Sequence, residues 1–147
     1  MNIYSVSAGV ACGSDLPIIN VTGSASIRTK IVEWLIGFST APADVATLLV
    51  FERTTDAGTG GTALTEEPID PLTVAASSAA VSGTFSTAPT DGNVLQRIAM
   101  NQRATHRWVA SAGRELVATA AANNGIMLNS ESSGATPQCD ATIFFGE

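Results

Sequence analysis

The fold is decided by the stretch SIRTKIVEWLIGF, residues 26–38, which is rich in β-branched and aromatic residues. Such residues favour strands, and the side chains of a strand alternate between its two faces. One face of the expected strand carries Trp34 and Ile36, and the other carries Ile31 and Leu35. Because large apolar residues occur on both faces, we expect both faces of this strand to be partly covered.

Short apolar segments separated by turn residues continue on both sides of this strand, which is the pattern of an all-β chain. The clearest neighbour is ATLLVFERT at residues 46–54. Residues 94–102 fit a helix or a strand, and we predict a strand, whereas residues 74–81 fit a weak strand or a short helix. The remaining expected strands are residues 3–11, 81–88, 105–110, 115–120, 125–129 and 141–145.

About eight or nine strands are too many for one open twisted sheet, which tends to curl or split. We therefore predict an all-β fold: a single-domain antiparallel β-sandwich or jelly roll that spans residues 1–147. Residues 1–25 are interpreted as an N-terminal arm or edge strand of that domain. We expect the domain to form trimers.

Charged residues are scarce in this chain. The charged fraction is 14%, against about 25% in ordinary soluble domains. Together with the abundance of small residues, this predicts that much of the surface is buried between subunits. The longest charge-free run, residues 71–90, is crowded with Ser, Thr, Pro and Gly and lacks the ~20 mainly apolar residues of a membrane-spanning helix. We therefore expect no contact with a membrane.

The most basic part of this acidic chain is VLQRIAMNQRATHRWVASAGRELVATAAANNGIML, residues 94–128. The formal net charge is −6, yet four of the seven Lys and Arg residues and the one histidine fall here. A positive patch on a negative protein predicts an acidic protein partner, which includes a second copy of the chain. The candidate interface residues of this block are Arg97, Arg103, His106, Arg107, Trp108 and Arg114.

Arg103 and Arg107 are the arginines that we expect to pair with carboxylates of a neighbouring subunit or of a larger shell. The guanidinium group suits this role because its planar fork binds a carboxylate with two hydrogen bonds. The candidate acids are Glu66, Glu67 and Asp70, which follow the glycine-rich part of a long connection. The alternative is a solvated strand edge, on which each ion pair contributes about 0–1 kcal/mol.

Trp108 and His106 are the other two candidates, and each has a simpler interpretation. Trp108 is expected in the core, with an interface anchor as the alternative, since buried Trp and Arg dominate protein contacts. His106 is interpreted as a structural hydrogen-bonding group, and the alternative is a pH-sensitive interface group.

Within the basic block, residues 101–128 resemble a sequence pattern of small structural proteins of tailed bacteriophages. The parts that carry the resemblance are NQRAT at 101–105, RWVA at 107–110, GRELV at 113–117 and NNGI at 123–126. The resemblance implies a capsid decoration, or cement, protein: a homotrimer on the outer surface of the virion's capsid, assembled in the host cytoplasm. Its partners would be further copies of itself and the major capsid protein.

Other functional classes find little support in the sequence. No Gly-x-Ser-x-Gly nucleophile turn, Cys/His cluster or EF-hand spacing is present, so we expect no catalytic residue, cofactor or metal. The negative chain charge argues against nucleic acid. Cys12 and Cys139 are interpreted as buried free thiols, which can meet if the terminal strands are neighbours. The alternative function is a carbohydrate- or receptor-binding knob of a phage fibre, since jelly rolls also serve lectins.

Overall fold

The computed structural model describes residues 1–131 and 136–147, and within them every regular element is a β-strand. The prediction of an all-β chain is confirmed. The strands are β1 (Ile3–Ala11), β2 (Leu16–Thr22), β3 (Lys30–Ser39), β4 (Ala46–Thr54), β5 (Thr62–Ala63), β6 (Glu67–Pro68), β7 (Ala79–Ser82), β8 (Asp91–Asn101), β9 (His106–Val109), β10 (Leu116–Val117), β11 (Gly125–Ser130) and β12 (Gln138–Gly146).

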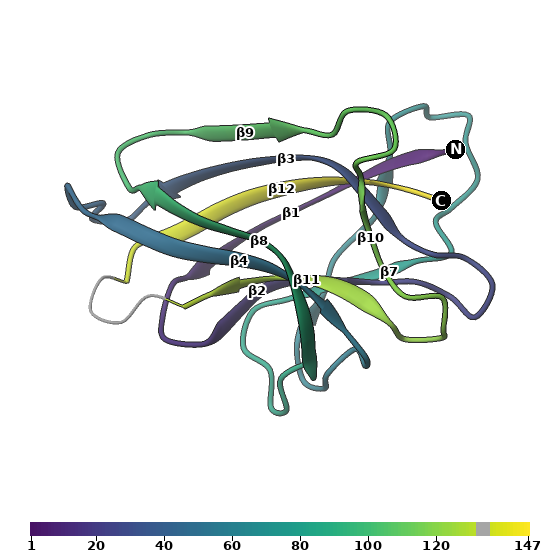
Figure 1. Ribbon diagram of the computed structural model, residues 1–147, viewed down its shortest axis with the longest axis horizontal. Helices are drawn as coiled ribbons and strands as arrows, with labels where there is room; N and C mark the ends of the chain where they lie inside the picture. The colour runs from purple at the N-terminus through teal and green to yellow at the C-terminus, as the bar shows by residue number, and fades with distance from the viewer. Residues whose placement is uncertain (132–135) are drawn as a thin grey trace.

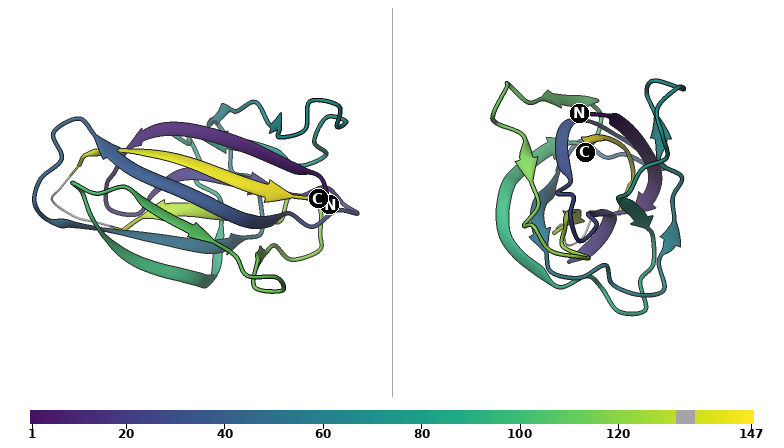
Figure 2. Two further views of the ribbon diagram at one scale, coloured as in Figure 1. Left: turned by 90° about the horizontal axis from the view of Figure 1, so that it is seen from above. Right: turned by 90° about the vertical axis from the view of Figure 1, so that its right-hand side faces the viewer.

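The strands form two antiparallel sheets in one domain (Figure 1). Sheet A has the order β10-β3-β12-β1-β6, with β9 also paired to β3, and sheet B has the order β5-β7-β2-β11-β4-β8. The pairs are nested from the two ends of the chain: β1 pairs with β12, β2 with β11 and β3 with β10. These nested pairs alternate between the two sheets, and the two termini lie side by side (Figure 2).

One hydrophobic core lies between the two sheets and draws on both of them. Trp34 of β3 stacks on Phe51 of β4, in the opposite sheet, with ring centroids 5.7 Å apart. Its indole Nε1 donates a hydrogen bond of 3.1 Å to Oε1 of Gln96 in β8. Trp34 therefore joins sheet A to two strands of sheet B. Seen end-on, the strands surround this core (Figure 2).

A β-bulge in β3 changes which residues reach the core. Glu33 pairs with Phe144, but the next pair joins Ile31 to Phe145, so Val32 is an extra residue in its strand. Strict alternation assigned Ile31 and Trp34 to opposite faces, and this prediction is wrong. Both belong to the same core, with exposed fractions of 0% and 3%.

Residues 1–25, interpreted from the sequence as an arm or edge strand, contribute two strands to the sheets. β1 lies between β12 and β6, and β2 lies between β7 and β11. The sequence of β2, LPIINVT, is almost entirely buried. A strand that is covered on both faces shows no alternation of polar and apolar residues, which is why the sequence pattern does not predict β2.

Other predicted strands differ from the observed ones in their bounds. The strand predicted at residues 94–102 is confirmed as β8, which begins earlier, at Asp91, and ends at Asn101. The strand expected at 81–88 ends at Ser82, because Gly83 adopts a φ of +86° that breaks the ladder. The strand expected at 115–120 is only two residues long. Cys12 and Cys139 are buried free thiols and form no disulfide.

We predict that Trp34→Ala destabilises the fold far more than Leu35→Ala, the adjacent residue on the outer face. Losing a buried aromatic side chain costs about 3–5 kcal/mol, whereas a surface substitution such as Leu35→Ala usually changes stability by only about 0.5 kcal/mol. Urea unfolding followed by intrinsic fluorescence and circular dichroism measures both variants. Equal losses for the two variants would contradict the assignment of Trp34 as the residue that joins the sheets.

Candidate protein-interaction surface

Apart from Arg97, which lies on β8 of sheet B, the candidate residues fall at two separate corners of sheet A. Arg103 lies in the turn between β8 and β9, and Arg107 lies on β9 beside β3. Glu67 lies on β6, which pairs with β1 at the other edge of the sheet. The strands β3, β12 and β1 separate the two groups. One copy of the chain therefore does not bring these arginines and acids together.

The basic corner is the surface around β9 and the turns at both of its ends. In β9 the exposed residues Arg107 and Val109 alternate with the half-buried residues His106 and Trp108. Trp108 stacks on Trp34, with ring centroids 6.2 Å apart, and borders the core. The Nε2 atom of His106 lies 3.3 Å from the carbonyl oxygen of Asn101. Both side chains therefore support the fold at this corner.

Two arginines of the basic block are paired within the chain. The Nε atom of Arg107 donates to Oε1 of Glu33 at 2.6 Å, and this hydrogen bond, followed by the charge of Glu33, raises the pKa of Arg107. An Nη atom of Arg97 lies 2.6 Å from Oε2 of Glu131. Both pairs are largely exposed at the arginine, so water weakens them. Neither arginine needs a second molecule to find a carboxylate.

Arg103 and Arg114 differ from them. Both are exposed, and within residues 1–131 and 136–147 neither guanidinium group contacts a carboxylate. Their backbones are fixed in turns: the N–H of Arg103 donates to Oδ1 of Asn101 at 2.8 Å, and the N–H of Arg114 donates to the carbonyl of Ser111 at 2.9 Å. These two cations are available to a partner.

The acidic corner is the segment from Glu66 to Val74. Glu66 is half-buried, and its Oε1 accepts the N–H of Ala80 at 2.6 Å, so this carboxylate has a structural role. Glu67 and Asp70 are exposed. Two of the three candidate acids therefore face solvent.

The same segment exposes a group of apolar side chains that sequence reasoning missed. Ile69, Leu72 and Val74 have exposed fractions of 54%, 92% and 72%. The signal was present, since three large apolar residues occur at 69–74, directly after the short strand that ends at Pro68. An exposed apolar group rimmed by charge is typical of a protein contact site.

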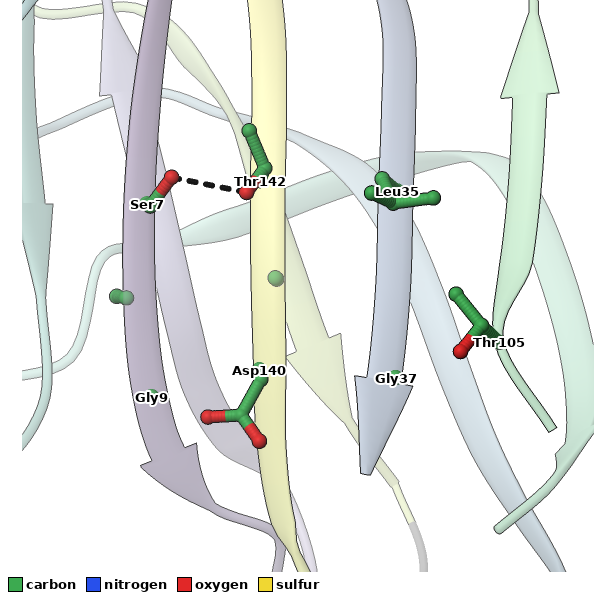
Figure 3. Close-up of a pocket in the computed structure, with 9 residues that line it drawn as sticks. Ser7, Gly9, Leu35, Gly37, Thr105, Asp140 and Thr142 are labelled. Carbon is green, nitrogen blue, oxygen red and sulfur yellow. Dashed lines mark hydrogen bonds between the residues drawn. The ribbon is translucent and has the colours of Figure 1, made fainter. Parts of the chain in front are cut away.

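A shallow hollow of about 530 Å³ opens on the outer face of sheet A, beside the basic corner (Figure 3). Ser7, Thr142 and Leu35 form one row across β1, β12 and β3, and the hydroxyl oxygens of Ser7 and Thr142 lie 2.8 Å apart. Gly37 and Thr105 continue the hollow toward Arg103. The lining contains no aromatic side chain, the platform that a carbohydrate-binding knob would use.

A buried carboxylate lies apart from these surfaces, on sheet B. Glu52 is 3% exposed, and its Oε1 accepts Nδ2 of Asn129 at 3.2 Å. The same amide donates to Oδ1 of Asp15 at 2.8 Å, while its own Oδ1 has no partner within the described residues. Burial raises the pKa of Glu52, and the charges of Asp91 and Glu131 add to the shift. Sequence reasoning did not single out this group.

The part of the chain that the structure describes contains no group of His, Cys, Asp and Glu side chains fit to hold a metal. It contains no helix long and apolar enough to cross a membrane. Comparison of the chain with protein-family models finds no matching family. Comparisons with curated proteins and with solved structures find no match either.

We predict that Glu52→Gln removes a destabilising effect of neutral pH. The folded-state pKa of Glu52 lies above its ordinary value of 4.5. The stability that protonated Glu52 contributes is therefore fully present below pH 4.5 and is lost as the pH rises through the raised pKa. The difference in unfolding free energy between variant and wild type should become more positive as the pH rises from below 4.5 through the raised pKa.

Urea unfolding at a series of pH values measures this difference, and Glu67→Gln, an exposed glutamate, is the matched control. A difference that stays constant with pH for Glu52→Gln would show that the buried carboxylate does not carry the effect.

Proposed function

We propose that this protein is a structural virion protein that binds the outer surface of a phage capsid as a homotrimer and stabilises the shell. The proposal is supported by the resemblance of residues 101–128 to phage structural proteins. The observation that carries it is the surface of sheet A. An exposed face with few charges lies between an acidic and a basic corner, and the basic corner holds cations that lack a partner within the described residues.

The strand pairing supports the finer assignment of a jelly-roll β-sandwich. In a jelly roll, strands from the two ends of the chain pair with each other, and successive pairs alternate between the two sheets. The nested pairs β1–β12 and β3–β10 lie in sheet A, whereas β2–β11 lies in sheet B. Jelly rolls recur in viral capsid proteins and in lectins, so the fold is compatible with the proposal without deciding it.

The proposed mechanism is passive. A protein that binds the assembled shell and not its separated subunits stabilises the shell by linkage. A trimer that contacts several shell subunits at once gains further from multivalency, because each later contact forms within one complex. No bond is made or broken, so the surface only has to be complementary and rigid. Sheet strands paired on both sides supply that rigidity.

Particles of the phage that carries this chain, prepared with and without it, test the proposal. We expect heads without the chain to release DNA at a lower temperature, and added purified chain to restore the original temperature. An equal amount of an unrelated acidic protein is the control. Immunogold labelling should place the chain on the outside of the head. Equal heat resistance with and without the chain, or its absence from the particles, would contradict the proposal.

A further inference from the structure

We propose that the acidic corner of one copy of this chain docks on the basic corner of the next copy, in a head-to-tail contact. This inference rests on the self-association in the proposed function and names the surfaces through which it occurs. The apolar loop at residues 69–74 would cover the region of the hollow and Thr105. Glu67 and Asp70 of that copy would approach Arg103 of the neighbour.

The loop at residues 69–74 is held in a fixed shape, although its side chains are exposed. The N–H of Ile69 donates to the carbonyl of Ile3 at 2.9 Å, and the hydroxyl of Tyr4 donates to the carbonyl of Val74 at the same distance. Within the loop, Oδ1 of Asp70 accepts the N–H of Leu72 at 3.0 Å. Ordering a loop costs conformational entropy on binding, and here much of that cost is already met by folding.

The basic corner offers a matching surface. Leu35 and Val109 have exposed fractions of 40% and 53%, so apolar area is present beside the arginines. Thr105 belongs to the linings of both the hollow on sheet A and a second hollow of about 410 Å³ beside it. Arg103 and Phe38 line that second hollow. The basic corner thus combines an apolar centre with an unpaired cation at its rim, the usual anatomy of an interface.

Charge disfavours a two-fold contact that is centred on either corner. Such a contact brings a corner to the same corner of the second copy, so at the acidic corner it would place Glu67 and Asp70 near the same acids. Like charges at an interface oppose binding. A head-to-tail contact places these acids beside Arg103 instead. Such contacts form a closed ring where the rotation between copies closes, and a trimer is one such ring.

Two charge variants, each with one corner disabled, test this contact. Arg103→Glu keeps the acidic corner, and the double variant Glu67→Gln, Leu72→Asp keeps the basic corner. The two altered corners carry like charges, so they do not pair with each other. All three side chains are exposed, so we expect both variants to fold, which circular dichroism verifies. Sedimentation velocity should show each variant alone as a monomer, with at least a tenfold weaker self-association than wild type. Arg28→Glu reverses an exposed cation outside both corners and should assemble as wild type does.

An equimolar mixture of the two variants gives the sharper result. One Arg103→Glu chain still has its acidic corner, and one chain of the double variant still has its basic corner. These two corners can dock once, so the mixture should form a heterodimer and nothing larger. Wild-type assembly by either variant alone, or a mixture that stays monomeric, would overturn the head-to-tail contact. A wild-type chain that is monomeric at every concentration would overturn it too. The heat resistance of particles tests the virion role separately. A trimer built through other surfaces would overturn the head-to-tail contact and leave the virion role intact.

Discussion

The contact of Trp34 with both sheets is the interaction on which the rest of the structure depends. Its ring stacks on Phe51 and on Trp108, and its indole N–H reaches Gln96. Stacked aromatic pairs contribute about 0.5–1.5 kcal/mol beyond the area that they bury. Because Trp34 points inward, its neighbours Glu33 and Leu35 point outward, where Glu33 holds Arg107 and Leu35 lines the hollow. The inward position of Trp34 therefore determines which residues of β3 lie on the outer face of sheet A.

The nested pairing means that the fold is complete only when both ends of the chain are in place. β1 and β12 pair along their whole lengths, from Ile3 with Gly146 to Ala11 with Gln138. The entropy of closing such long loops must be lost before the contacts form, which makes folds of this kind slow to assemble. In return, a strand with partners on both sides is protected from pairing with other chains, and β12 lies between β1 and β3.

The faces on which side chains of one strand lie could be predicted from the sequence. The partners that distant strands supply to those side chains could not. The outward position of Arg107 and the inward position of Trp108 follow from simple alternation in β9. The bulge at Val32 left no local signal, because it depends on how β12 pairs with β3. Likewise, Glu66 appeared as one of three surface acids, but Ala80, fourteen residues away in sequence, supplies the N–H that holds it. Partners that distant in sequence are set by the fold, so side-chain type alone did not separate Glu66 from Glu67.

The acidic and basic corners are complementary to each other and lie too far apart to meet within one chain. An inter-chain disulfide tests this idea most directly. In a chain with Leu72→Cys and Thr105→Cys, we expect mild oxidation to link the copies into covalent oligomers on a non-reducing gel, while each single variant stays monomeric. The buried Cys12 and Cys139 remain in every variant and serve as the common background. Dimers formed by Leu72→Cys alone, or a double variant that does not cross-link, would contradict the head-to-tail contact.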